Sequence, residues 1–218
     1  MQQQSTWERL APLTGVVFVA IAVAVFAIGG STPGDHDTAQ EVQSFYGQHH
    51  DKHMILAFML ALSIPFLLFF VSILRYELRG AGGTGQLANA AFAGGVLAAV
   101  GFGILAFVHL ALADAAGSAN TLGTTQVLNV LDNNDYLPVA AGLGVLVLGA
   151  GLSTVRHGGL PRWLGWVAIV LGIAAFTPAG FIAFLAGGVW IIVVSILFTI
   201  ARHSTGGPTP AVAEPVTT

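Results

Sequence analysis

The sequence predicts an all-α membrane helix bundle with six transmembrane helices, the fifth short or re-entrant, and short amphipathic helices in two outer loops. Two observations carry this prediction. Seven Lys or Arg and ten Asp or Glu occur in 218 residues, and 55% of the chain is hydrophobic, with a mean hydropathy of +0.81. A water-facing globule carries about a quarter charged residues, so this chain lacks the polar surface that such a protein needs.

Stretches without charged side chains predict the first four spans. A helix needs roughly 20 apolar residues to cross about 30 Å of hydrocarbon, so each stretch accounts for one span. The first stretch also has features of a signal peptide, because Arg9 precedes it and Ala27-Ile28-Gly29 resembles a cleavage site. Its length favours a retained span. The four stretches are 10–34, 54–74, 87–113 and 136–155.

The fifth apolar stretch, 163–201, is too long for one span. As a single helix it would measure roughly 58 Å, about twice the thickness of the hydrocarbon core. We expect it to fold back at Thr177-Pro178-Ala179-Gly180, because Pro removes a helical hydrogen bond and Gly permits a turn. Gly187-Gly188 is a second candidate break, and a re-entrant fifth segment is the alternative to six full spans.

The charges predict the orientation. Short loops rich in Lys and Arg remain cytoplasmic, and six spans place only Lys52 outside, whereas five would separate Arg162 from Arg202. We therefore expect a multi-pass protein of the cytoplasmic membrane with both termini inside. Residues 1–203 form one transmembrane domain in this prediction, and 204–218 a disordered cytoplasmic tail. The expected inner basic residues are Arg9, Arg75, Arg79, Arg156, Arg162 and Arg202.

Two outer loops, 30–52 and 114–135, contain helix signals. Thr38-Ala39-Gln40-Glu41 has the form of a capping box, and the apolar residues after it follow at helical spacing. We expect an amphipathic helix there that lies on the membrane surface and runs into the second span. In the second loop, Thr124 or Thr125 is expected to cap a short helix.

The strongest polar cluster is Gln48-His49-His50-Asp51-Lys52-His53 at the outer mouth of the second span. On one helix, His49 and His53 would face the same side, as two imidazoles that share a metal ion must. Five of the seven histidines fall on the outer side, and imidazoles with carboxylates favour zinc or copper(II). The alternative is a solvated interfacial loop, which is common for His and Asp. The candidate metal ligands are His49, His53, His109, His50, His36, Asp51 and Asp114.

Other chemistry is excluded or weakly supported. The chain has no cysteine, so disulfides, thiolate metal sites and a Cys nucleophile are absent. Few basic residues argue against a nucleic-acid partner. Gly80-Ala81-Gly82-Gly83-Thr84-Gly85 matches a dinucleotide motif in letters only, because it joins two membrane helices. No Gly-x-Ser-x-Gly elbow occurs, and the spans hold no charged residue for a proton path.

Small residues in the third and fourth spans predict close helix packing. In the third span Gly95, Ala99 and Gly103 repeat at intervals of four, a spacing that lets helix backbones approach. We expect this span to be central, and Gly142 and Gly149 to act similarly in the fourth.

Two segments carry a resemblance to a known group. The first segment is Glu41–Arg79, which has Phe45-Tyr46 before the His-rich stretch and Leu74–Arg79 after the span. The second segment is Leu160-Pro161-Arg162-Trp163-Leu164-Gly165-Trp166. Both are similar to segments of a large group of actinobacterial multi-pass membrane proteins of uncharacterised function. The resemblance implies the topology and supplies no reaction.

The sequence therefore favours a non-enzymatic binding or accessory protein with an acidic, His-rich outer face, which offers ligands for a divalent metal such as zinc or copper or a surface for a larger membrane complex. Its expected partners are the lipid bilayer and a membrane-protein complex or a second copy of itself. One alternative is a metal-dependent membrane enzyme acting on a lipid or amphiphile at the outer leaflet. Another is a small-solute transporter with an uncharged path. No catalytic residue is identified.

Overall fold

The structure is a computed structural model that describes residues 10–34, 36–82, 85–118 and 121–204. Every regular element in this part of the chain is helical, which confirms the predicted all-α class. Arg9 and the predicted tail beyond Ser204 lie outside the described residues. The elements are η1 (Ala11–Leu13), α2 (Thr14–Gly29), α3 (Ala39–Gln48), α4 (His50–Gly80), α5 (Gln86–Ala116), α6 (Leu122–Asp132), α7 (Tyr136–His157), α8 (Arg162–Ala174) and α9 (Gly180–Ser204).

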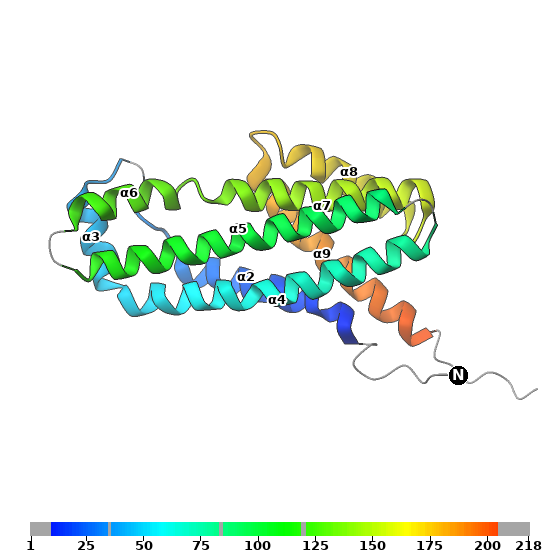
Figure 1. Ribbon diagram of the computed structural model, residues 1–218, viewed down its shortest axis with the longest axis horizontal. Helices are drawn as coiled ribbons and strands as arrows, with labels where there is room; N and C mark the ends of the chain where they lie inside the picture. The colour runs from blue at the N-terminus through cyan, green and yellow to red at the C-terminus, as the bar shows by residue number, and fades with distance from the viewer. Residues whose placement is uncertain (1–9, 35, 83–84, 119–120, 205–218) are drawn as a thin grey trace, which may run out of the picture.

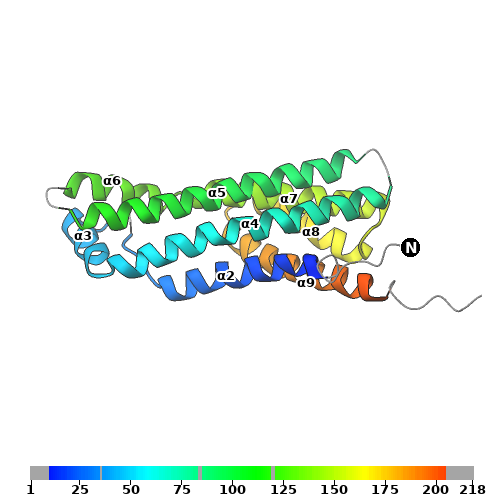
Figure 2. The same cartoon turned by 60° about the horizontal axis from the view of Figure 1, so that its bottom comes forward.

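Among the described residues, five segments are long and apolar enough to cross a membrane. They comprise η1 with α2, then α4, α5, α6 together with α7, and α9, whereas α8 is a shorter apolar helix of 13 residues. Helices α4, α5 and α7 run side by side along the long axis of the molecule, with α2 beside α4 (Figure 1; Figure 2). The described ends of the chain lie at the end opposite α3 and α6 (Figure 1).

Helix α5 packs against α7 through glycines that allow the two backbones to touch. A Cβ added at Gly142 would lie 2.6 Å from the Cα of Ala98, and one at Gly94 would lie 2.8 Å from the Gly142 carbonyl oxygen. One at Gly149 would lie 2.8 Å from the Ala91 nitrogen. These positions cannot accept a side chain without separating the helices, so the small residues of both spans do permit close packing. The row of Gly95 and Gly103 faces Val71 and Ile64 of α4, and Gly94 faces α7.

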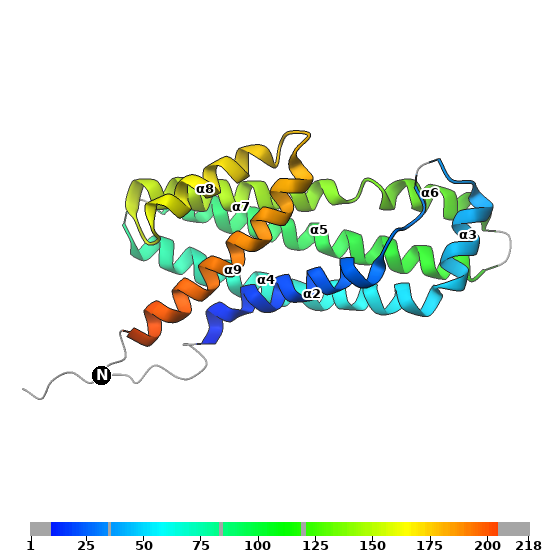
Figure 3. The same ribbon diagram turned by 180° about the vertical axis from the view of Figure 1, so that it is seen from behind.

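The fifth apolar stretch folds back where the sequence predicts. Helix α8 ends at Ala174 and α9 begins at Gly180, so the break includes Thr177 and Pro178. Helix α9 continues through Gly187-Gly188, so that alternative break is wrong. Figure 3 shows α8 lying along α7 and α9 crossing the bundle obliquely from the middle of α7 towards the start of α2. Consequently α8 and α9 cover only the half of the bundle nearer the chain ends.

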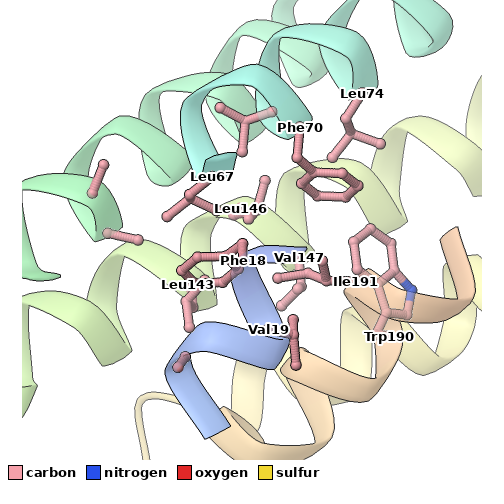
Figure 4. Packing of buried hydrophobic residues seen from close by; sticks show 14 of the residues in the cluster. Phe18, Val19, Leu67, Phe70, Leu74, Leu143, Leu146, Val147, Trp190 and Ile191 are labelled. Atoms are coloured by element: carbon pink, nitrogen blue, oxygen red, sulfur yellow. The ribbon is translucent and has the colours of Figure 1, made fainter. Parts of the chain in front are cut away.

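The core joins four helices in that half. Phe18 of α2, Phe70 of α4, Leu146 of α7 and Ile191 of α9 are at most 3% exposed and belong to one cluster (Figure 4). Between membrane helices such side chains hold the bundle together mainly by close van der Waals packing, because lipid tails are as apolar as the core. Trp190 donates from Nε1 to the Leu164 carbonyl at 3.2 Å, which fixes α9 against α8.

Helices α3 and α6 form a cap over the opposite end (Figure 1). The predicted capping box is present: the Thr38 amide donates to Glu41 Oε2 at 2.8 Å, and the Glu41 amide donates to Thr38 Oγ1 at 3.4 Å. Val42 and Tyr46 of α3 are fully buried against α5, so this apolar face packs on protein instead of the expected membrane surface. Helix α6 begins at Leu122 after Thr121, so the predicted caps at Thr124 and Thr125 are wrong.

Side-chain amides of α6 hold the loop between α2 and α3 over the bundle. Asn129 Nδ2 donates to the Gly34 carbonyl at 3.1 Å, and Asn133 Nδ2 donates to the Pro33 carbonyl at 3.3 Å. On the other side of this loop, Lys52 Nζ donates to the Gly29 carbonyl at 2.9 Å, where α2 ends. These contacts give the cap a defined position above the helices.

Candidate functional site

A cavity of about 200 Å³ lies beneath the cap, where α8 and α9 no longer cover the bundle. It is lined by the end of α2, by α4 and α5, and by α7 with the last residue of α6, and the start of α9 forms its floor. From His53 to Leu60 along α4 it extends about 10 Å at 1.5 Å per residue. Its lining residues are Val25, Phe26, Gly29, Gly30, Thr32, His53, Leu56, Leu60, Leu105, His109, Asp132, Asp135, Tyr136, Val139, Ala140, Gly180, Phe181 and Phe184.

The polar end of the cavity is organised by Asp132, the last residue of α6. Its Oδ1 lies 2.6 Å from His109 Nδ1, and its Oδ2 accepts from the Tyr46 hydroxyl at 3.1 Å. The Asp132 side chain is only 5% exposed, so both contacts stabilise a carboxylate that is largely removed from water. Three helices of the cap end, α3, α5 and α6, therefore meet at one carboxylate.

Tyr46 serves this carboxylate as a hydrogen-bond donor. The residue is fully buried on α3. Burial and the neighbouring Asp132 charge raise the pKa of the Tyr46 hydroxyl well above its ordinary value. The hydroxyl therefore remains protonated and keeps donating to Asp132 throughout the physiological pH range.

Among the described residues, His53 is a fully buried side chain with no hydrogen-bond partner for either ring nitrogen; other buried side chains, such as Thr154 and Ser195, lack a partner for one atom. The His53 ring lies between those of Tyr46 and His109, with centroid distances of 4.7 and 5.8 Å. Leaving a buried donor or acceptor unpaired costs about 1–3 kcal/mol, so native structures rarely do so without a functional reason.

Asp135 adds a second unsatisfied group to the same wall. It lies one helical turn after Asp132, and its Oδ2 is buried with no hydrogen-bond partner in the part of the chain that the structure describes. Together, Asp135 and His53 present one carboxylate acceptor and an imidazole that can both donate and accept. These two side chains can therefore bind a polar group of a ligand by hydrogen bonds.

The structure separates the predicted metal ligands into several groups. His53 and His109 meet at the cavity. His50 lies at the rim, with Nδ1 3.0 Å from Asp51 Oδ1 and Nε2 3.9 Å from Asp114 Oδ1. His36 is exposed. No three His, Cys, Asp or Glu side chains among the described residues are arranged to hold a metal ion.

His49 does not form the expected pair with His53. The expected continuous helix is interrupted at His49, where α3 ends and α4 begins. The His49 ring lies against Phe45, with a centroid distance of 4.8 Å, and its Nδ1 is 2.8 Å from the Phe45 carbonyl oxygen. The local break therefore turns this imidazole towards its own helix.

Sequence reasoning missed Asp132, Asp135 and Tyr46 as site residues. The two acids are three residues apart immediately before the fourth apolar stretch, at the expected membrane level of His109. That spacing was the available signal. Tyr46 gave none, because its position in the apolar face of α3 suggested a packing role.

The comparisons with known proteins add no functional constraint. No family model, curated protein or solved structure matches the chain, and the resemblance to the actinobacterial group stays a prediction.

Proposed function

We propose that this chain is a six-span protein of the cytoplasmic membrane that binds a small ligand in the outer cavity lined by His53, His109, Asp132 and Asp135. Support for the orientation comes from the charges, since Lys52 lies at the cap end and the described arginines lie near the other end. Helix α8 would be the short fifth segment of this count: it has 13 residues, fewer than a full crossing needs, and it runs back along α7 so that both described chain ends lie on one side, an outcome that a re-entrant segment also gives. The amphipathic helices α3 and α6 would then form an outer cap.

The observation that carries the proposal is His53. A buried imidazole without a partner lowers stability, and the cost is recovered when a ligand supplies the missing hydrogen bonds. The cavity that His53 lines is mostly apolar with a few convergent polar groups, as ligand sites are.

The test is native mass spectrometry with elemental analysis of the full chain extracted in mild detergent from its own membrane. We expect a molecule that co-purifies with the wild type and with His50→Ala, and falls about tenfold in His53→Leu, as the loss of a buried hydrogen bond implies. His50 is the matched control, because it sits on the same helix outside the cavity. Equal recovery from all three proteins would contradict the proposal.

A divalent metal is one possible outcome of the same measurement. His53 and His109 provide two imidazoles, and a carboxylate behind His109 is the usual support for a metal-bound histidine. Stoichiometric zinc or copper that is lost in both His53→Leu and His109→Leu would identify the ligand as a metal ion. The remaining donors would then have to come from Asp135, the ligand itself or water.

An enzyme acting on an amphiphile is the second candidate function. It is favoured by the pairing of Asp132 with His109 Nδ1, because a carboxylate on one ring nitrogen orients the other for proton transfer. His109→Gln would then abolish turnover of a bound molecule while His53→Leu weakens its binding. The transporter alternative has less support, since backbone contact closes the α5–α7 interface at Gly94 and Gly142.

A further inference from the structure

We infer that the ligand is a single-chain amphiphile, with a hydrogen-bond-donating head that carries no negative charge in the His53–Asp135 cavity and its tail in a groove between α2 and α9. This inference rests on the proposed function of the cavity and names the ligand class. Three features support it: a second, apolar cavity that adjoins the first, the charge of the polar end, and the depth of each part along α2.

The apolar groove adjoins the polar cavity and shares two lining residues with it. It has a volume of about 370 Å³, and Phe26 and Phe184 line both spaces. Their rings meet edge to face at a centroid distance of 5.9 Å, at the junction of the two spaces. The residues that line the groove are Phe18, Val19, Ala22, Val23, Phe26, Ala27, Phe102, Leu143, Phe184, Leu185, Gly188 and Ile191.

The groove is built to hold hydrocarbon. All of its lining residues are apolar, and Phe18, Val19 and Ile191 form its inner wall, where they belong to the buried core (Figure 4). Its rim is open to the membrane side, since Val23 is 58% exposed and Leu185 is 52% exposed. An alkyl chain can therefore enter sideways from the bilayer without crossing a polar surface.

The polar end selects against anionic heads. Asp132 and Asp135 both line it, and no Lys or Arg occurs among the described lining residues. The nearby Lys52 ammonium is engaged by the Gly29 carbonyl. A phosphate or carboxylate would face two carboxyl groups, and of the two imidazoles that line this end His109 is already engaged by Asp132. An ammonium or hydroxyl group can instead donate to Asp135 Oδ2 and to His53.

The order of the two parts along α2 matches the order of groups in a membrane amphiphile. Gly29, the last residue of α2, lines the polar cavity, and Phe26 lies at the junction. Phe18 lines the groove about 12 Å deeper than Phe26 at 1.5 Å per residue. A head at the end of the apolar helix and a tail towards its middle is the arrangement that the bilayer itself imposes.

The test uses photoreactive probes in phosphatidylcholine vesicles that contain the full chain. Three probes share one alkyl chain with a diazirine at its middle and differ only in the head, which is a primary amine, an alcohol or a carboxylate. After illumination, labelled peptides are mapped by mass spectrometry. We expect the amine and the alcohol to label 18–27 and 184–191, in competition with the unlabelled compound, and the carboxylate to label them about tenfold less.

Comparing the three head groups shows whether the site recognises positive charge or hydrogen-bond donation. Labelling by the amine alone identifies recognition of a cation by Asp135, and labelling by both amine and alcohol identifies recognition of a donor regardless of charge. Equal labelling by the carboxylate overturns the inference about the head. Uniform labelling of all lipid-facing helices, including Phe107 of α5, overturns the inference about the tail.

A pair of variants tests the groove without disturbing the fold. Ala27 and Ala20 are both exposed alanines of α2, and only Ala27 lines the groove. Ala27→Trp should block labelling of the groove, and Ala20→Trp should leave it unchanged. If Ala27→Trp has no effect while a molecule still co-purifies in a His53-dependent manner, the tail assignment fails and the proposed function stands. If co-purification of the molecule does not depend on His53, both the tail assignment and the proposed function fail.

Discussion

Helix α7 has two differently built sides in the half of the bundle nearer the cap. Against α5, glycines bring the backbones into contact, and a Cβ at Gly101 would lie 2.7 Å from the Val139 nitrogen. On its other side, the same helix lines the polar cavity, where His53 and Asp135 have polar atoms without partners among the described residues. The side facing α5 is closed by backbone contact. The side facing the cavity is open: it has free space and polar atoms whose hydrogen bonds a ligand would complete. The rigid contact between α5 and α7 keeps the cavity on the other side of α7 from collapsing.

The closed side should be the most sensitive to mutation. Gly142→Ala puts a methyl group against the Ala98 backbone, so α5 and α7 must separate, and we expect a loss of at least about 2 kcal/mol in the free energy of unfolding. Gly187→Ala is the control, because its Cβ meets nothing within 4 Å and Ala favours the helix. Unfolding in mixed micelles measures both; equal stability of the two variants would contradict the packing described for α5 and α7.

The polar end should be held together by Tyr46. Tyr46→Phe removes the donor to Asp132 Oδ2 and leaves a buried carboxylate oxygen unsatisfied, which should cost about 1–3 kcal/mol. Tyr76→Phe is the matched substitution at a side chain that is 74% exposed, and it should be neutral. The same unfolding measurement applies. A neutral Tyr46→Phe would show that the cap does not depend on this carboxylate.

The open side should behave in the opposite way. His53→Leu replaces an unsatisfied buried imidazole with an apolar side chain of similar reach, so the ligand-free protein should gain about 1 kcal/mol in stability while it loses binding. His50→Ala should change neither quantity. Thermal unfolding after removal of co-purified molecules tests this expectation. A destabilised His53→Leu would mean that the imidazole already has a partner.

The smallest effect should come from the capping box at the edge of the cap. Hydrogen bonds from the Thr38 amide and hydroxyl lower the pKa of Glu41 from 4.5, so they stabilise the start of α3 above that pH and are lost as the pH falls through the lowered pKa. The amide signals of Thr38 and Glu41 in NMR spectra should shift together over that range. Glu41→Gln should remove this titration and leave the rest of α3 in place.

The sequence was sufficient for features that depend on local chemistry. The low charge content indicated membrane helices, Pro178 and Gly180 marked the break before α9, and Thr38 with Glu41 marked the start of α3. The glycines of α5 and α7 indicated that these helices pack closely, although not against which neighbour. Each of these signals lies within a few residues of the structure that it predicts.

The candidate site depends on contacts between distant segments, and this is why most of it was not predicted. Tyr46 and Asp132 meet although 86 positions separate them, and only the packing of α3 on α6 brings them together. The expected His49–His53 pair assumed a continuous helix that the chain interrupts at His49. Helix periodicity gives the face of a residue, but it gives neither the neighbour of that face nor the point at which the helix stops.

The turn between α8 and α9 also has a consequence for how ligand size could vary. Its position along α7 decides how far Gly180 and Phe181 rise towards the polar end, and both residues form the floor of the cavity. One extra helical turn in each of these helices would raise the floor by about 5.4 Å without altering any polar side chain. The length of this hairpin therefore sets the depth of the cavity. Adding or removing a few residues in this apolar segment would select a shorter or longer ligand.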